Sequence, residues 1–263
     1  MNSKNEEVLF QAVNRVATIT LNRPGDENRM TPDVLERLGA IADVLALDEE
    51  TLAVIFTGAG DKHFSAGMLH PKVRAKLTRE QILEIVRLAN SVFDRIEALP
   101  QITIAALNGI TRAGAAELTL ACDMRIAAAH ATFGVPEAKW GGFPGAGGPV
   151  RLPGIVGRAR ALELICTGRE LNAEEMARFG LVLQVFSKDE LMGEAHALAA
   201  RIAVCGPLAV RGAKRIVKVR EASGFNAARE LSDALRHALE STHDMQEGAA
   251  ANLEGRAPRF TGK

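Results

Sequence analysis

Two isolated carboxylates stand in glycine-rich parts of this sequence, where residues chosen only for packing would be unusual. Glu117 closes the segment 108–117, which begins with Asn-Gly, and Glu137 lies in the Gly/Pro-dense segment 133–148. Gly114 and Glu117 are three residues apart, so on a helical turn the glycine amide and the glutamate side chain share one face. A free amide at a helix start can stabilise an oxyanion, and a carboxylate can move a proton.

A third segment, 63–68 (HFSAGM), consists largely of small residues. Small residues let the backbone approach a ligand and leave amide N–H groups free to point at it. Plainer interpretations exist, since 63–68 could be an ordinary tight turn and Glu117 could simply complement a helix dipole. Together, two amide-bearing loops and two carboxylates are the parts needed for proton transfer or water activation beside a carbonyl group.

Alternating strand and helix patterns place these segments after strands. Apolar, β-branched runs predict the strands, and amphipathic spacing predicts the helices between them. The strands are expected at 16–21, 51–57, 102–107 and 124–128, and helices are expected from Thr31 onward and over 81–99 and 115–121. This recurrence predicts an α/β fold with parallel strands, whose carboxyl ends gather the loops where ligands bind.

The last third of the chain is predicted to be mainly helical. Helices are expected over 158–166, 173–179, 188–203, 208–221 and 225–243. Only 181–185 has a strand pattern in this part. Before it, the aromatic residues Phe133, Trp140 and Phe143 indicate an ordered loop that walls a pocket, because aromatic side chains favour burial.

The composition argues against several classes of function. Lys plus Arg and Asp plus Glu number 32 each, so no net field favours nucleic acid or an anionic membrane. No apolar run approaches the ~18–20 residues of a membrane span, and the polar residues 1–7 resemble no secretory signal, which predicts a cytoplasmic protein. Cys122, Cys166 and Cys205 are interpreted as small buried side chains, and the histidines lack ligand spacing, so no metal site is predicted.

The chain resembles the crotonase, or enoyl-CoA hydratase/isomerase, superfamily in motifs spread along nearly its whole length. These motifs are Asn-Arg-Pro at 22–24, Phe-Ser-Ala-Gly at 64–67, Asn-Gly to Glu at 108–117, Phe-Gly-x-Pro-Glu at 133–137, Pro-Gly-Ala-Gly-Gly at 144–148, and the segments 157–164, 167–168, 180–182 and 247–262. The resemblance implies an α/β fold with a crotonase-like spiral of ββα units in residues 1–200. It also implies a C-terminal helical trimerisation module in 201–263, and hence a homotrimer or a hexamer made as a dimer of trimers.

The same resemblance assigns roles to single residues. Met68 and Gly114 fall where the family's two oxyanion-hole amides lie, and Glu117 and Glu137 fall on both catalytic glutamates of the hydratases. The loop Ala66-Gly67-Met68-Leu69 would, with Gly114, bind the CoA thioester. The implied reaction is the reversible addition of water to a 2-enoyl-CoA, as in fatty acid metabolism, with no metal or redox cofactor.

Some residues near the site depart from the family pattern. The usual Asp of the thioester loop is replaced by Leu69, and the next residue, His70, could lie in the pocket or on the surface. Arg112, where an apolar residue is typical, could contact phosphate or point to solvent. The basic helix with Arg211, Lys214, Arg215, Lys218 and Arg220 is interpreted as a solvated face, with contact to the CoA phosphate as the alternative.

These departures leave alternatives to the hydratase. One is an isomerase of the same superfamily, and another is a carbon-carbon hydrolase that acts on a diketone without CoA. A third is a weakly catalytic subunit that serves as a binding partner or scaffold. Retention of both Glu117 and Glu137 favours the hydratase, because many relatives with other reactions keep only one of the two or neither.

Overall fold

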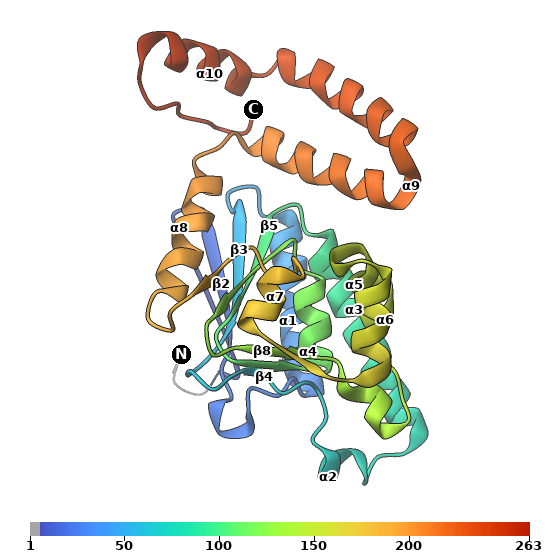
Figure 1. The fold of residues 1–263 in the computed structure, drawn as a ribbon. Coiled ribbons are helices and arrows are strands. Elements are labelled where there is room, and N and C mark those ends of the chain that lie inside the picture. The colour runs from blue at the N-terminus through green and yellow to red at the C-terminus, as the bar shows by residue number, and fades with distance from the viewer. Residues whose placement is uncertain (1–5) are drawn as a thin grey trace.

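The computed structural model describes residues 6–263, and the polar residues 1–5, on which the prediction of a cytoplasmic protein partly depends, lie outside the described residues. The chain forms two β-sheets surrounded by helices (Figure 1). The larger sheet contains, in spatial order, β1 (Val8–Val13), β2 (Val16–Leu21), β3 (Ala53–Gly58), β5 (Ile102–Leu107), β7 (Met124–Ala128) and β10 (Val185–Phe186). The smaller sheet contains β4 (His63–Ser65), β6 (Ile110–Arg112), β8 (Thr132–Gly134) and β9 (Glu170–Asn172).

The two sheets are built from one repeating unit. The pairs β3-β4, β5-β6 and β7-β8 each give one strand to the larger sheet and the next strand to the smaller sheet, and a helix follows each pair. Strands β2, β3, β5, β7 and β10 pair in parallel, whereas β1 pairs antiparallel with β2. This arrangement confirms the expected α/β spiral of ββα units and its parallel strands.

The helices begin and end where local sequence signals favour it. Their bounds are α1 (Pro32–Leu47), α2 (Pro71–Arg74), α3 (Arg79–Ala98), α4 (Gly114–Leu120), α5 (Gly148–Val156), α6 (Arg158–Thr167), α7 (Ala173–Arg178), α8 (Leu191–Ala203), α9 (Pro207–Glu240) and α10 (His243–Glu254), with 3-10 turns η2 (Pro24–Asp26) and η3 (Pro136–Trp140). Thr31 caps α1 by accepting the Val34 N–H, and Thr78 forms a capping box with Gln81 at the start of α3. Both caps satisfy amides that the first helical turn leaves without partners.

The core lies around the larger sheet. All residues of β3 are buried, which requires cover on both faces and explains why this strand is almost continuously apolar. Helix α8 contacts β2, β3 and β5, while α1 packs against α3. The sheet is therefore covered on both faces by packed side chains, and it holds the loops at its strand ends in place.

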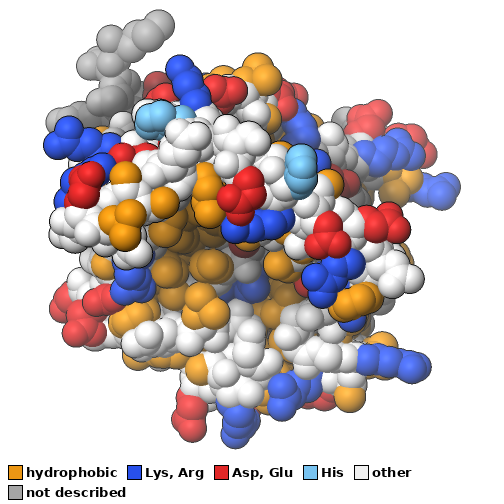
Figure 2. Space-filling view, turned by 90° about the horizontal axis from the view of Figure 1, so that it is seen from above, with side chains coloured by type: hydrophobic (Ala, Val, Ile, Leu, Met, Phe, Trp, Pro, Cys, Tyr) orange, Lys and Arg blue, Asp and Glu red, His pale blue; other side chains and the backbone are white. Residues whose placement is uncertain are grey.

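The C-terminal helices α9 and α10 stand at one end of the molecule, with α8 beside the sheet below them (Figure 1). Gly224, with φ of 87°, interrupts α9 and gives two helical stretches, in agreement with the helices predicted at 208–221 and 225–243. Figure 2 shows this end of the molecule and a hollow in which apolar side chains gather. The division of the chain into a core and an oligomerisation module stays a prediction. Within residues 6–263, no helix combines the length and apolarity needed to cross a bilayer.

Several sequence-based expectations about local structure are wrong. The segments 63–65 and 110–112 are not loops but short strands of the smaller sheet. Most of 181–185 is turn, and only Val185 enters a strand. Helix α5 was not predicted because it begins with glycine and proline and contains Pro153. In each case pairing or packing with distant segments outweighs a weak local signal.

Expectations about burial also need correction. Cys122 is buried, and burial raises the pKa of its thiol to about 12, but Cys166 and Cys205 are exposed because they lie on outward faces at helix ends. Phe133 is buried, whereas Trp140 is 83% and Phe143 71% exposed. Trp140 ends η3 and Phe143 follows it, and both lie on the surface and take no part in the core.

Candidate active site

The loop Ala66-Gly67-Met68-Leu69 directly follows β4 and lies beside the start of α4. Gly67 has φ of 99°, and a β-carbon there would stand 3.1 Å from both the Arg112 carbonyl oxygen and the Ala113 β-carbon. Only glycine therefore permits so close an approach of the two backbones without strain. The Gly67 N–H donates to the buried Ser65 hydroxyl at 3.1 Å, which fixes the turn.

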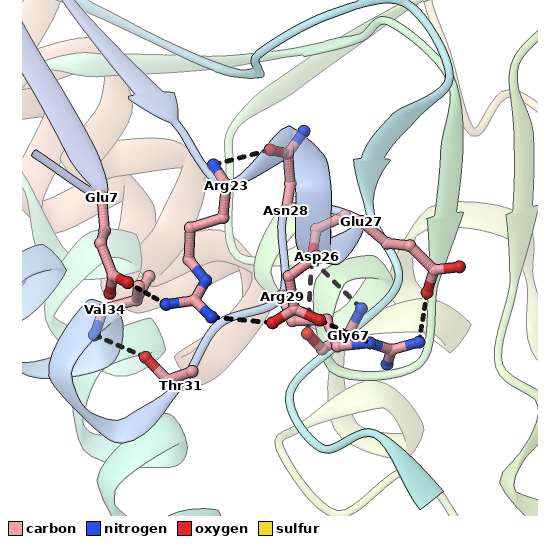
Figure 3. Close-up of polar contacts among 10 residues, drawn as sticks. Glu7, Arg23, Asp26, Glu27, Asn28, Arg29, Thr31, Val34 and Gly67 are labelled. Carbon is pink, nitrogen blue, oxygen red and sulfur yellow. Dashed lines mark hydrogen bonds and ion pairs between the residues drawn. The ribbon is translucent and has the colours of Figure 1, made fainter. Parts of the chain in front are cut away.

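The turn 22–30 between β2 and α1 supports this loop from the other side (Figure 3). The Met30 N–H donates to the Gly67 carbonyl, and the Ala66 N–H donates to the Glu27 carbonyl, each at 3.0 Å. Two successive residues of the thioester loop are therefore tied to a segment almost forty residues earlier in the chain.

Asn28 gives the turn 22–30 its shape. Its side chain is buried, donates to the carbonyls of Ala59 and His63 at 2.9 and 2.8 Å, and accepts the Arg23 N–H at 3.0 Å. Its φ of 54° is a left-handed conformation that asparagine tolerates better than most residues. Asn28 thus links the Asn-Arg-Pro motif to the start of β4 through its side-chain hydrogen bonds.

The amide of Gly114 begins α4, and the residue before it is strained. Ala113 has φ of 54° and ψ of −130°, which side-chain-bearing residues rarely adopt, and its N–H donates to the Gly134 carbonyl at 2.9 Å. Such strain persists only where surrounding contacts enforce it, and it is common at functional sites. Within residues 6–263, neither the Met68 N–H nor the Gly114 N–H donates a hydrogen bond.

Gly114 and Met68, predicted as a pair, are brought together. A β-carbon on Gly114 would stand 2.8 Å from the Cγ atom of Met68, so the methionine side chain passes directly over the glycine. Asn108 keeps the neighbouring strands in register, since its buried side chain donates to the carbonyls of Gly58 and Gly60 at 2.9 and 2.8 Å. The two amide-bearing loops are therefore fixed relative to each other.

Glu117 is buried in the first turn of α4 and is 1% exposed. Its Oε1 atom accepts the N–H groups of Ala146 and Gly148 at 2.7 and 2.9 Å. The pKa of Glu117 is raised to about 7, mainly because its side chain is buried. The negative charge of nearby Glu137 also raises this pKa, whereas the two amide hydrogen bonds lower it. A carboxyl with such a pKa can serve as acid or base at neutral pH.

Glu137 lies in η3 and is half-buried. Burial raises the pKa of Glu137 as well. Its Oε2 atom is buried and has no hydrogen-bond partner among the described residues. A buried polar atom without a partner is costly, which makes this oxygen a candidate hydrogen-bonding group of the site.

Other residues considered from the sequence lie outside this constellation. His70 caps α2, because its Nδ1 atom accepts the Lys72 N–H at 3.1 Å, and Leu69 beside it is half-buried. Arg112 forms an ion pair with Glu170 of β9. Neither side chain is needed to explain the positions of the glutamates.

An apolar groove of about 420 Å³ lies between α5 and α6 and contains neither glutamate. It is lined by Phe143, Pro149, Pro153, Arg158, Ala161, Leu162 and Ile165. The exposed Phe143 therefore lines a surface groove, while Trp140 is not among its lining residues.

Sequence reasoning missed the residues that hold the predicted ones. The Ala146 and Gly148 amides that bind Glu117 lie in the Gly-Ala-Gly-Gly run, and a β-carbon on Gly148 would stand 3.2 Å from Oε1 of Glu117. The run was noted for its glycine density and as a family motif at 144–148, but neither signal indicated that its amides bind Glu117. Ser65 and Asn108 carried a stronger one, since each is a polar residue next to an apolar strand.

Residues 6–263 contain no cluster of three or more His, Cys, Asp or Glu side chains arranged as metal ligands. The chemistry must be argued from the two carboxyl groups and the two backbone amides. Whether a metal or other cofactor takes part in the reaction is a separate question, and the expectation that none does stays a prediction.

Comparison with known proteins agrees with the geometry. The spiral of ββα units followed by C-terminal helices defines the crotonase fold, and a crystal structure of an enoyl-CoA hydratase from Bacillus anthracis superposes with a TM-score of 0.95, at 37% identity over 98% of this chain and all of that one. Residues 11–263 match the enoyl-CoA hydratase/isomerase family. The chain therefore belongs to this family.

Curated relatives include hydratases with short acyl groups in their names. A short-chain-enoyl-CoA hydratase of Clostridium acetobutylicum is 35% identical over 95% of both chains. A crotonyl-CoA hydratase of Syntrophomonas wolfei is 34% identical over 98% of this chain and 99% of its own length. These similarities span the whole fold and include both sheets and the C-terminal helices.

Proposed function

We propose that this chain is an enoyl-CoA hydratase that adds water reversibly to a 2-enoyl-CoA thioester. The observation that carries the proposal is the pair of buried carboxyls, Glu117 held by two amides and Glu137 with a buried oxygen that lacks a partner. The relatives named as hydratases of short enoyl-CoA substrates support the same reaction.

In the proposed mechanism, the thioester carbonyl accepts hydrogen bonds from the amides of Met68 and Gly114. Glu117, ionised, takes a proton from a water whose oxygen adds to Cβ. The electron pair of the double bond moves toward the carbonyl oxygen, where the amides stabilise the negative charge, and Glu137 delivers its proton to Cα. The reactive form thus holds one proton on the pair of carboxyls, on Glu137. The negative charge of an ionised Glu137 raises the pKa of Glu117, so the two carboxyls do not easily ionise together.

The test follows the loss of enoyl-thioester absorbance with crotonyl-CoA, and mass spectrometry identifies the product. The 3-hydroxyacyl-CoA should form, and Glu117→Gln and Glu137→Gln should each lower kcat by about 10² or more, because each removes a group that transfers a proton. Glu174→Gln, an exposed acid on α7, is the matched control and should keep full activity.

Other products would point to the alternatives. Conversion of a 3-enoyl-CoA to the 2-enoyl isomer without hydration would favour an isomerase. Failure to bind CoA would exclude the thioester reaction and favour a carbon-carbon hydrolase or a scaffold. Loss of activity in only one glutamate variant would contradict the two-carboxyl mechanism.

We also propose that α9 and α10 assemble the chain into a homotrimer, or a hexamer of two trimers. In the single chain these helices leave large apolar side chains exposed, among them Val217, Phe225 and Leu253 at 59%, 60% and 89%. Exposed apolar surface of this extent is typical of protein interfaces. Sedimentation should give a trimer or a hexamer, and Phe225→Asp should shift it toward smaller species, whereas a monomeric wild type would contradict the proposal.

A further inference from the structure

The loop 145–148 determines where the carboxylate of Glu117 points. Both hydrogen bonds that Glu117 accepts come from this loop, through the amides of Ala146 and Gly148. Residues 145–147 precede α5, whose first residue is Gly148, and glycine at three of the four positions 145–148 gives the backbone little stiffness of its own. Something outside the loop must therefore hold these two amides in position.

Asn90 on α3 holds the first amide. Its Nδ2 atom donates to the Gly145 carbonyl at 2.9 Å. That carbonyl and the Ala146 N–H belong to one peptide group, so the group accepts from Asn90 on one side and donates to Glu117 on the other. Hydrogen bonds linked through one peptide group polarise each other, which strengthens the donor that faces the carboxylate.

Arg151 on α5 holds the next peptide group. Its Nη1 atom donates to the Ala146 carbonyl at 3.3 Å, and its Nε atom donates to Glu97 on α3 at 2.8 Å. Asp94 on the same helix pairs with the guanidinium as well, and the Arg151 side chain is only 8% exposed. The planar guanidinium thus clamps the loop onto α3.

We propose that Asn90 and Arg151 are positioning residues that set the orientation and the proton affinity of Glu117 through the backbone of residues 145–148. This inference rests on the proposed hydratase function only in assigning Glu117 a role in proton transfer. Neither Asn90 nor Arg151 hydrogen-bonds Glu117, and each acts through peptide groups that lie between.

The charged groups that face Glu117 set the sign of the expected change. Glu137 of η3 raises the pKa of Glu117, and Arg151 of α5 lowers it, while Asp94 and Glu97 of α3 neutralise part of the arginine charge. The two loop amides also lower it. Loss of the Asn90 contact or the Arg151 contact should weaken the hydrogen bonds from these amides to the Glu117 carboxylate. The pKa of Glu117 should then rise.

The experiment is an infrared pH titration of the Glu117 carboxyl, obtained as the difference between each variant and the same variant with Glu117→Gln. Asn90→Leu keeps the side-chain shape and removes the donor, and its midpoint should lie about one pH unit above the wild-type value. The acid limb of kcat/KM should move in parallel. Ser91→Ala, exposed on the same helix, should keep the wild-type midpoint.

Arg151→Lys separates positioning from simple charge. Lysine keeps the positive charge but cannot hold the Ala146 carbonyl and both acids of α3 at once, so the midpoint should rise here too. If Asn90→Leu does not fold, Asn90→Ser removes the same contact with a smaller side chain. Wild-type midpoints in folded Asn90 and Arg151 variants would overturn the proposal.

The infrared readout is independent of the proposed reaction, because it needs no thioester. If the protein hydrates no enoyl-CoA but the midpoints shift, the hydratase function fails and the positioning role stands. If hydration is normal and the midpoints do not move, only the positioning role fails.

Discussion

Every residue of α4, the helix that carries Gly114 and Glu117, is buried, whereas only Pro207, Gly212, Lys214 and Ala228 are buried along the whole of α9. Around α4, most polar groups find their hydrogen-bond partners within the same chain. The buried carboxylate of Glu117, for example, accepts two backbone N–H groups. Around α9, large apolar side chains face outward. The first region is therefore largely complete within a single chain, whereas the second leaves large apolar side chains exposed.

The two regions are joined at an ion pair between a buried lysine and a half-buried aspartate. Lys214 of α9 is 7% exposed, and its Nζ atom donates to Asp123, just after α4, at 2.6 Å and to the Gln101 carbonyl at 2.7 Å. Asp123 also accepts the amide and hydroxyl of Thr103 at 2.8 and 2.9 Å. The expectation of a fully solvated basic helix is thus wrong at Lys214, because its ammonium group has partners inside the core.

The largest predicted effect on stability comes from removing the ion pair between Lys214 and Asp123. Lys214→Met removes the buried cation that pairs with the half-buried Asp123, and should lower the free energy of unfolding by about 3 kcal/mol. Arg215→Met, one residue later and exposed, is the control and should change it by less than about 0.5 kcal/mol. Denaturant unfolding measures both, and equal stabilities would mean that α9 is not anchored through Lys214.

Glu117→Gln should change stability in a pH-dependent way. The folded pKa of about 7 lies above the ordinary value of 4.5, so the folded chain binds this proton more tightly and the free energy of unfolding falls as pH rises from about 4.5 to 7. Glutamine cannot ionise but still accepts both loop amides.

The Glu117→Gln variant should therefore match the wild type near pH 4.5 and be more stable at pH 8, by on the order of 3 kcal/mol. Unfolding by denaturant at the two pH values measures the difference. The same pH dependence in both proteins would show that folding does not raise the pKa of Glu117 and that its ionisation does not destabilise the folded chain.

Arg112→Ala gives the smallest predicted effect. The pair between Arg112 and Glu170 is largely exposed, so its loss should lower the free energy of unfolding by less than about 1 kcal/mol. Thermal unfolding at low and high salt measures this change. A large loss of crotonyl-CoA turnover in this variant would instead indicate contact with the substrate, one of the roles considered for Arg112.

The sequence predicted the four central strands of the larger sheet well, but it predicted neither β1 nor the bounds of β10, and it predicted the smaller sheet poorly. β2, β5 and β7 have the predicted bounds because apolar, β-branched runs between turn signals are strong local patterns. β4, β6 and β8 are three residues each, too short for any periodicity to be visible. Their strand form depends on pairing between segments that are distant in sequence.

The candidate site divides in the same way. Glu117, Glu137, Met68 and Gly114 were predicted from the resemblance to the crotonase family, and the fold places the Met68 side chain against Gly114. The supports of Glu117 were not found, because Asn90 and Arg151 are common polar residues on ordinary helices. Nothing local distinguishes an asparagine that faces solvent from one that faces the Gly145 carbonyl.

The sequence by itself determined the family, the order of strands and helices, and the chemical groups available to the site, because these depend on residue types and their spacing. Only the tertiary structure decided which carboxyl is raised to a pKa of about 7, which lysine is buried, and which aromatics stay exposed. Burial, hydrogen-bond direction and electrostatic coupling depend on distances between residues far apart in the chain, and such distances do not exist until the chain has folded.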